Sequence, residues 1–322
     1  MRSFLAVCGR TLSHVLILIP ESLRWTLATV VSWVLFDLIR FRRKIVLQNL
    51  DIVFPKKTPD EKKSLGRKSL ARLIYNFYEF CLFAVIDDSW ISTHTKFKGL
   101  EHLDGAMKQG KGVLLLSLHL GHGDMAISML AHRGYPLYVI SKLFKVKWLN
   151  DFWFGTRQRF GANFLDPHGK SSSFDILRVL KKQGIVIFVL DQYMGPPYGL
   201  ETTFFGVKTG TAYGLSLFAV KTGAPVLPVW TYRDENGNNI IEIGAAVSVE
   251  ERASRDETLL ATTQKYNYVL ENLIQRHPED WMWIHRRWKK YLSDLPDETS
   301  PETSRPSDPN SSKSGPTDVG GR

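Results

Sequence analysis

The residues best suited to chemistry are a histidine and a carboxylate within the run Ser-Leu-His-Leu-Gly-His-Gly-Asp-Met at positions 117–125. An imidazole paired with a carboxylate can take a proton from a hydroxyl group, because the carboxylate fixes the tautomer and stabilises the imidazolium that forms. This interpretation makes His119 a general base and Asp124 its orienting partner. The alternative is an ordinary turn, in which His119 hydrogen-bonds a loop and Asp124 caps a helix. His122 competes for the role of base, but as a loop histidine it is expected to be solvated.

The position of this pair favours chemistry. It follows the apolar run Gly112–Leu118, which predicts a buried strand, and it precedes a helix predicted over Asp124–His132. Loops at the carboxyl ends of strands carry the chemistry in open α/β sheets. Two glycines, Gly121 and Gly123, would let a substrate approach the backbone closely.

A second polar cluster follows another apolar strand, Ile185–Leu190, and should share an edge of the sheet with the first. Asp191 and Gln192 are suited to positioning a sugar or phosphate headgroup, although the Gly-Pro-Pro run that follows is equally typical of an irregular turn. Thr209 stands in a Thr-Gly-Thr run that is predicted to open a helix over Thr211–Thr222. A helix start of this kind can hold an anion, and threonines are also ordinary capping residues.

Five further residues complete the candidate substrate-binding set. Phe205 and Gly206 precede the Thr-Gly-Thr run and are assigned with it to a substrate site. Arg157, Arg159 and Arg233 lie near predicted helix or strand ends. Single cations of this kind are more often solvated surface residues than ligands.

Residues 278–289 combine three tryptophans with cationic and imidazole side chains, in the order Pro-Glu-Asp-Trp-Met-Trp-Ile-His-Arg-Arg-Trp-Lys. Such a segment could stack on nucleic acid, lie on a membrane surface or tie the end of the domain to its core. The chain has no Gly-x-x-x-x-Gly-Lys-Ser/Thr motif, and no Gly-x-Gly-x-x-Gly motif follows a strand, so a nucleotide cofactor is not supported. The missing Gly-x-Ser-x-Gly elbow argues against an α/β-hydrolase.

Strand and helix patterns alternate along most of the chain. Several of the strands are continuously apolar, which argues for a mostly parallel central sheet with helices on both faces, the α/β class. An Asn-Gly turn predicts a hairpin between the last two strands. The predicted strands are 96–99, 112–118, 137–141, 185–190, 225–232 and 240–243, and the predicted helices are 59–86, 124–132, 147–160, 172–183, 211–222 and 256–276.

The composition points to an anionic partner. Lys and Arg number 42 against 32 acidic residues, a formal net charge of +10, which suits a membrane surface, nucleic acid or an acidic carrier protein. The two cysteines, Cys8 and Cys81, lie far apart and have no metal-ligand spacing. We therefore expect neither a disulfide framework nor a metal site.

Both ends of the chain differ from its middle. Leu23–Ile39 is apolar and contains two tryptophans, and four basic residues follow between positions 40 and 44. Its length is ambiguous between a short membrane span and an interfacial helix, and the basic flank favours the cytoplasmic side. Residues 293–322 have almost no apolar side chains and are expected to be disordered. We predict a membrane-associated helical segment over 1–44, a catalytic domain over 45–292 and a tail over 293–322.

Taken together, these motifs resemble those of the bacterial late acyltransferases of lipid A biosynthesis, the lauroyl and myristoyl transferases, within the lysophospholipid and glycerol-phosphate acyltransferase superfamily. The likeness runs from about residue 10 to 290. The most specific parts are the closing Trp-x-His-Arg-Arg-Trp-Lys segment and the Phe-Phe-Gly segment. The motifs that carry it are Arg42-Arg43, Asn49-Leu50, Phe54-Pro55, His119-x4-Asp124, Asp191-Gln192, Phe205-Gly206, Gly223-Ala224-Pro225 with Pro228, and Pro278 to Lys289.

The resemblance implies a glycerol-phosphate acyltransferase-like fold and an O-acyltransferase at the cytoplasmic face of the inner membrane. It implies transfer of a fatty acyl chain from acyl carrier protein to a hydroxyl of a lipid A precursor or related glycolipid, with no metal and no other cofactor. His119 would be the base with Asp124 as its partner. Arg157 or Arg159 would stabilise the negative acceptor or the oxyanion. Acyl carrier protein, a membrane lipid acceptor and an anionic membrane surface are the expected partners, and nucleic acid is not expected.

Two other functions stay open at this point. The first is acylation of a lysophospholipid or an aminolipid. The second is a non-catalytic lipid-binding or polyanion-binding protein on the same fold. This chain has Gly123 where members often have a bulky aromatic residue, and it lacks the Glu-Gly-Thr-Arg block of glycerol-phosphate acyltransferases.

Overall fold

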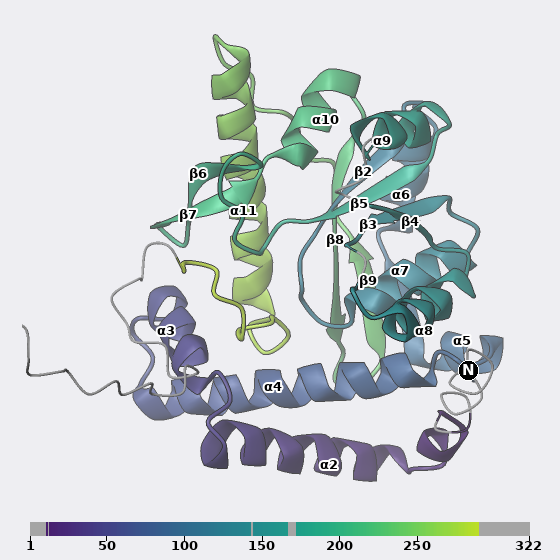
Figure 1. Cartoon of the computed structure of the whole chain (residues 1–322), viewed down its shortest axis with the longest axis vertical. Helices are drawn as coiled ribbons and strands as arrows, with labels where there is room; N and C mark the ends of the chain where they lie inside the picture. Colours follow the sequence, from purple (N-terminus) through teal and green to yellow (C-terminus); the bar gives the residue numbers. More distant parts are fainter. Residues whose placement is uncertain (1–10, 12, 143, 167–171, 290–322) are drawn as a thin grey trace, which may run out of the picture. The chain divides into compact units, whose positions relative to one another are not determined.

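The computed structural model describes residues 11, 13–142, 144–166 and 172–289, and all structural statements below concern these residues. Cys8 and the expected tail over 293–322 therefore lie outside the described residues. The described part begins with helices, continues as an α/β alternation and ends in a long helix followed by the tryptophan-rich segment (Figure 1).

Most elements form where the hydrophobic periodicity predicts them. The helices are α2 (Glu21–Trp33), the π-helical turn η1 (Val34–Leu38), α3 (Arg43–Val53), α4 (Pro59–Leu82), α5 (Asp88–His94), α6 (Leu100–Met107), α7 (Gly123–His132), α8 (Lys147–Gln158), α9 (Ser172–Lys181), α10 (Gly214–Thr222) and α11 (Arg255–Arg276). The strands are β1 (Thr95–Lys98), β2 (Val113–Ser117), β3 (Leu137–Ile140), β4 (Asn163–Leu165), β5 (Ile185–Val189), β6 (Gly199–Phe204), β7 (Val207–Ala212), β8 (Val226–Arg233) and β9 (Asn239–Ile243).

Seven strands form one mostly parallel sheet in the order β1-β9-β8-β2-β5-β3-β4. The strands β8, β2, β5, β3 and β4 run parallel to one another. In the same sheet, β8 is antiparallel to β9, to which the predicted Asn-Gly turn connects it. The α/β class with a mostly parallel sheet is thereby confirmed. Because β2 and β5 are adjacent and parallel, the loops that follow them emerge at the same edge of the sheet.

Helices cover both faces of this sheet (Figure 1). Alternate residues of the central strands, such as Leu115 and Ile187, pack with buried residues of α6 and α7 on one face. On the other face, Phe188 of β5 lies against Phe218 of α10, with ring centroids 6.0 Å apart. Burial on both faces explains why the central strands read as continuous apolar runs.

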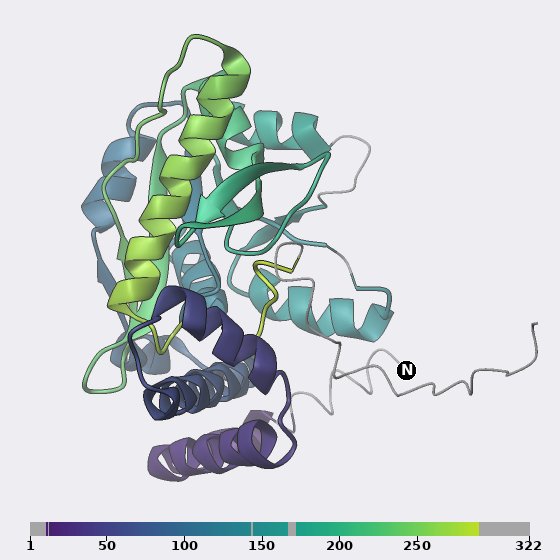
Figure 2. The same ribbon diagram turned by 90° about the vertical axis from the view of Figure 1, so that its left-hand side faces the viewer.

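The N-terminal helices form a layer beside this α/β unit. Figures 1 and 2 show α2 lying along α4, with α4 between α2 and the sheet. Trp25 of α2 stacks on Tyr75 of α4 at 4.1 Å, and Ser32 donates a 2.7 Å hydrogen bond to the backbone oxygen of Arg67. Within the described residues, no single helix is long and apolar enough to cross a membrane. One bent pair, Glu21–Leu38 with Arg43–Val53 at 94°, satisfies the length and composition criteria together.

One predicted helix begins too early. The run expected to open a helix at Thr211 instead belongs to β7, which pairs antiparallel with β6 in a two-stranded sheet, and α10 begins at Gly214. The hairpin turn consists of Phe205 and Gly206, whose φ angles are 51° and 74°. Two consecutive positive φ angles are typical of the tight turns that match the twist of a hairpin. The predicted anion site at a helix start is therefore not formed by Thr209.

Candidate active site

The loop after β2 places His119 directly against Asp191, which follows β5. Nδ1 of His119 lies 2.8 Å from Oδ1 of Asp191, and the backbone N–H of His119 donates to Oδ2 at 3.1 Å. Asp191 is only 2% exposed, whereas the side chain of His119 is 39% exposed. With Nδ1 engaged by the carboxylate, Nε2 is the ring nitrogen left to accept a proton from a bound hydroxyl. The side-chain nitrogen of Gln192 lies 3.4 Å from this Nε2.

The electrostatics of the pair favour the charged form. Burial disfavours the imidazolium, but the charge and hydrogen bond of Asp191, helped by Asp124, outweigh burial and raise the pKa of His119. Burial likewise opposes ionisation of Asp191, yet His119 and the other donors lower the pKa of Asp191 to about 2. The structure therefore holds a permanent carboxylate behind an imidazole of increased basicity, which is what general base catalysis requires.

Asp124 has a different partner from the one the sequence predicts. In the structure it accepts hydrogen bonds from Nε of Arg157 at 2.8 Å and from Nη2 of the same residue. Arg157 is almost fully buried, and its guanidinium lies over the rings of Trp153 and Phe80. Asp124 still acts on His119 through its charge, but the carboxylate that touches the imidazole is Asp191. The spacing of the motif misleads here because the closer partner comes from another strand.

The tryptophan-rich segment, residues 278–289, completes the site by pairing with the loop after β2. Residues 119–121 and 280–282 run antiparallel and form a bridge between Leu120 and Trp281. The indole N–H of Trp281 donates to Oδ2 of Asp191 at 2.8 Å, so the buried carboxylate accepts three hydrogen bonds. Gly121 takes part in this close approach, since its φ is +64° and a Cβ there would lie 2.2 Å from the backbone oxygen of Thr231.

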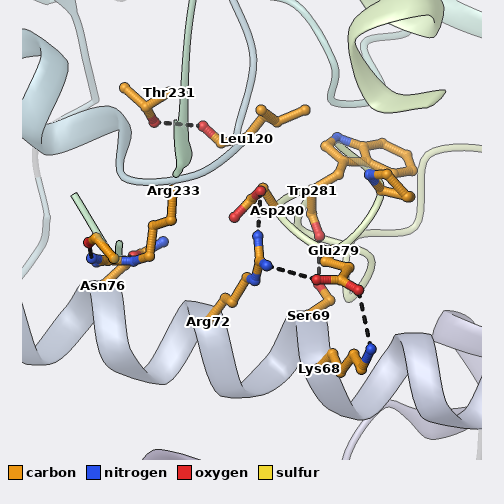
Figure 3. A network of polar contacts seen from close by, with 12 residues as sticks. Lys68, Ser69, Arg72, Asn76, Leu120, Thr231, Arg233, Glu279, Asp280 and Trp281 are labelled. Atoms are coloured by element: carbon orange, nitrogen blue, oxygen red, sulfur yellow. Dashed lines mark hydrogen bonds and ion pairs between the residues drawn. The ribbon is translucent and has the colours of Figure 1, made fainter. Parts of the chain in front are cut away.

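The same segment is held by the N-terminal helices, as Figure 3 shows for α4. Arg72 binds Glu279 and Asp280 at 2.6 and 2.5 Å, and Ser69 donates to the backbone oxygen of Trp281 at 2.6 Å. From α3, the side chain of Asn49 donates at 2.7 and 2.8 Å to two backbone oxygens further along, those of residues 283 and 285. The segment is therefore a structural tie between the helical layer and the active-site loop, one of the three alternatives considered for it.

Buried Arg287 organises the neighbouring loops. Its Nη1 donates at 2.7 Å to the backbone oxygens of both Gln192 and Gly210, and its Nη2 donates to the hydroxyl of Thr211 at 2.6 Å. Burial lowers the pKa of Arg287 to about 10, against the opposing charges of Asp191 and Glu271. The predicted substrate residue Thr209 is fully buried and donates to the backbone oxygen of Arg287 at 2.6 Å. Thr209 therefore ties β7 to this segment.

Three other predicted substrate residues also have structural contacts. Phe205 and Gly206 form the β6–β7 turn, where the backbone N–H of Phe205 donates to Glu271 of α11 at 2.8 Å. Arg159 donates to the backbone oxygens of Phe83 and Ile86 just after α4. The structure thus brings together His119, Asp191 and Gln192. It places Phe205, Gly206 and Arg159 elsewhere.

Arg233 and His122 belong to a buried polar cluster behind the active-site loop. Arg233 pairs with Glu79 at 2.5 Å and lies over the ring of Tyr75. His122 is buried, not solvated as expected. Its Nδ1 accepts the backbone N–H of Met125 at 3.3 Å, which caps α7. Burial, together with the charges of Arg233 and a second nearby arginine, lowers the pKa of His122 well below its usual value, which favours the neutral imidazole.

The chemistry available at this edge of the sheet is proton transfer by an imidazole. Among the residues that the structure describes, no group of three His, Cys, Asp or Glu side chains is placed to hold a metal ion. Trp281 and Arg287 were missed as parts of the site by reasoning from sequence alone. The available signal was that their segment combines aromatic and basic residues.

Comparison with known proteins identifies the family of this chain. The model of the family described as bacterial lipid A biosynthesis acyltransferase matches residues 1–290. This chain belongs to that family. It is therefore an acyltransferase of lipid A or glycolipid biosynthesis, and the O-acyltransferase activity expected from the motifs is confirmed.

Named relatives of this acyltransferase differ in what their names say they acylate. It is 25% identical over 258 residues to the lipid A biosynthesis lauroyltransferase of Escherichia coli K12, covering 79% of this chain and 81% of that protein. It is 26% identical over 260 residues to the lipid A biosynthesis palmitoleoyltransferase of the same organism, covering 77% and 79%. It is 27% identical over 197 residues to the phosphatidylinositol mannoside acyltransferase of Mycobacterium tuberculosis H37Rv, covering 61% and 60%.

Proposed function

We propose that this acyltransferase moves a fatty acyl chain from acyl carrier protein to a hydroxyl of a lipid A precursor, with His119 as the general base. The observation that carries the proposal is the contact between the half-exposed imidazole of His119 and the buried carboxylate of Asp191. The pair lies at the carboxyl edge of a parallel sheet, where open α/β proteins carry their chemistry.

In the proposed step, Nε2 of His119 takes the proton of the acceptor hydroxyl as its oxygen attacks the thioester carbonyl. Asp191 holds the ring by Nδ1 and stabilises the imidazolium that forms. The tetrahedral intermediate then collapses, the C–S bond breaks, and the imidazolium returns the proton to the leaving thiolate. The acyl chain ends as an ester on the acceptor, and the carrier leaves as a free thiol.

Asp124 and Arg157 have a supporting role in this proposal. Asp124 adds negative charge near the imidazole, and its ion pair with Arg157 fixes the first turn of α7 next to the active-site loop. Because Arg157 is buried and already paired, we assign it to holding α7, and the sequence-based role in oxyanion stabilisation is the less favoured one.

The partners and location follow from the chemistry proposed. An acidic carrier protein suits a chain with a net charge of +10. The acceptor is a membrane lipid, and α2 exposes apolar side chains next to a basic flank, which suits an anionic membrane surface. We place the enzyme at the cytoplasmic face of the inner membrane, where an acyl carrier protein is available as donor.

Substitution of His119 by alanine is the direct test of this function. The variant should retain its fold but lose acyl transfer by about 10²–10⁴-fold, because a positioned general base contributes about that much and no other group takes its place beside Asp191. Transfer of labelled acyl chains from acyl carrier protein to a lipid A precursor measures the rate, and circular dichroism reports the fold. Near-normal turnover by a folded variant would contradict the proposed mechanism.

A phosphoglycolipid acceptor is the second candidate, because one named relative is a phosphatidylinositol mannoside acyltransferase. Lipid profiling of a deletion strain separates the two acceptors. Loss of a secondary acyl chain from lipid A supports the first candidate. Loss of an acyl chain from a mannosylated phospholipid, with lipid A unchanged, supports the second.

A further inference from the structure

The hydrogen bond from Trp281 to the active-site carboxylate does more than fill the core. Asp191 has two carboxylate oxygens, and they are used differently. Oδ2 accepts the indole N–H of Trp281 at 2.8 Å and the backbone N–H of His119 at 3.1 Å, while Oδ1 faces the imidazole at 2.8 Å. Two donors on Oδ2 fix the plane of the carboxylate and so aim Oδ1 at Nδ1 of His119.

We propose that Trp281 is a positioning residue for acyl transfer, acting through Asp191 to hold the imidazole of His119. This inference rests on the proposed function and deepens it. The indole is 1% exposed, and its N–H is directed at a group that touches the base. A tryptophan that only filled space would not need an ionised acceptor, since its N–H could be satisfied by a backbone oxygen, as those of Trp283 and Trp288 are.

The backbone around Trp281 is fixed on both sides, which a positioning role requires. On one side, the residues before and after it pair with the active-site loop. The N–H of Gly121 donates to the backbone oxygen of Asp280 at 2.8 Å, and that of Met282 donates to the backbone oxygen of His119 at 3.0 Å. The tryptophan and the histidine are thus held in one short antiparallel ladder.

On the other side, helix α4 holds the same residues (Figure 3). Arg72 binds the buried carboxylate of Asp280, and Ser69 binds the backbone oxygen of Trp281 itself. A series of contacts therefore leads from α4 through residues 280–281 to Asp191 and then to the imidazole. Helix α4 therefore takes part in orienting the base through residues 280 and 281.

The chain offers a matched pair of substitutions that tests this role. Trp281→Phe and Trp283→Phe each remove one buried indole N–H from the same segment, and the two rings pack together with centroids 4.6 Å apart. Trp281 donates to Asp191, whereas Trp283 donates to the backbone oxygen of Pro278 at 2.7 Å. A purely structural role predicts similar losses of stability and similar kinetics for both variants.

The positioning role predicts different kinetics for the two. Trp281→Phe should lower kcat by at least about 10-fold with little change in KM, because a hydrogen bond to a charged group is lost. The acid limb of its kcat/KM profile should move to higher pH by about 0.5 unit or more, since the carboxylate loses a donor that competes with the imidazolium. Trp283→Phe should stay within about twofold of the wild type with an unmoved limb.

Protonation of His119 can also be followed without substrate. The full-length protein carrying ¹⁵N-labelled histidine can be titrated by NMR, and the His119→Ala variant assigns the signal. The pKa of His119 should be raised in Trp281→Phe and unchanged in Trp283→Phe. Equal kcat values, equal acid limbs and equal titrations for the two tryptophan variants would overturn the inference. Activity of His119→Ala would instead overturn the proposed function, and the titration would still report whether Trp281 acts on the imidazole.

Discussion

Two carboxylates influence His119, one by direct contact and the other only through its charge. Asp191 touches the ring, and Asp124 acts only through its charge while paired to Arg157. A carboxylate that touches Nδ1 sets the tautomer, and replacing it by an amide inverts which nitrogen carries the proton. We therefore expect the two acids to differ in importance.

The asparagine variants of these two acids should separate them. Asp191→Asn should lower kcat by about 10³–10⁴-fold, whereas Asp124→Asn should cost about 10-fold, because only the former leaves the imidazole in the wrong tautomer. Steady-state kinetics with acyl carrier protein as donor measure both values. The opposite ranking would restore Asp124 as the partner of His119 and place the Asp191 contact outside the mechanism.

The pH profile follows from the same pair. The pKa of His119 is raised, and the base must be neutral, so the acid limb of kcat/KM should lie above the ordinary imidazole value of about 6.5.

The stability that His119 contributes depends on pH in the opposite direction. A raised folded-state pKa means that the imidazolium form stabilises the fold below the unfolded pKa, and that this contribution is lost as pH rises through the folded value. As pH rises through the folded-state pKa, activity should increase while the contribution of His119 to stability decreases. Rates and melting temperatures measured over the same pH series check this. An acid limb below 6.5 contradicts this account.

At the scale of the element, the turn between β2 and α7 depends on one glycine more than on the other. Gly121→Ala should destabilise the protein by about 2–4 kcal/mol, because φ is +64° and the new Cβ would press on the carbonyl of Thr231, which is backbone and cannot move aside. Gly123→Ala is the control, since nothing lies within 4 Å of its Cβ and its φ is not left-handed. Its effect on stability should be within about 0.5 kcal/mol. Thermal unfolding of both variants checks the difference, and equal melting temperatures would refute it.

The elements that the sequence predicted well are those whose burial produces a clear period. Apolar runs such as 112–118 and 185–190 correspond to β2 and β5, and the Asn-Gly turn before β9 is the hairpin turn of the structure. The β6–β7 hairpin was missed because its strands are polar and because Phe205 occupies a left-handed conformation that sequence normally reserves for glycine or asparagine.

The candidate site was predictable in part. His119, Asp191 and Gln192 each follow a buried strand, so their common edge could be inferred from topology. Their mutual contacts could not, since Asp191 is 72 residues from His119 and Trp281 is a further 90 away. Spacing along the chain favoured Asp124 over a partner that only the adjacency of β2 and β5 reveals.

At the scale of the whole described unit, α2 presents an apolar face away from α4. Leu23, Leu27 and Val30 are each about half exposed, whereas Ala28 and Ser32 face inward. An exposed stripe of large apolar residues next to basic residues is typical of binding to an anionic bilayer surface. The predicted membrane-associated segment over 1–44 remains a prediction, and the exposed face gives it a physical basis.

Vesicle flotation tests this surface. Leu23→Ser combined with Leu27→Ser should lower the partition coefficient onto vesicles containing anionic lipid by at least about 10-fold, given about 1.5–3 kcal/mol for each fully buried leucine. Leu260→Ser is the matched control, because Leu260 is 43% exposed on α11. Its partition coefficient should not change. Equal partitioning of the double variant and the wild type would show that α2 does not bind the bilayer.

The bridge between Leu120 and Trp281 also has a consequence for biosynthesis. Ribosomes make the helical layer and all nine strands of the described residues before they reach the indole that holds Asp191. During synthesis, His119 and Asp191 are therefore present before the donor of residue 281 is made. A chain cleaved just before Pro278 would keep the His119 motif and lack this donor. Synthesis of residues 278–289 thus decides when the proposed site is complete.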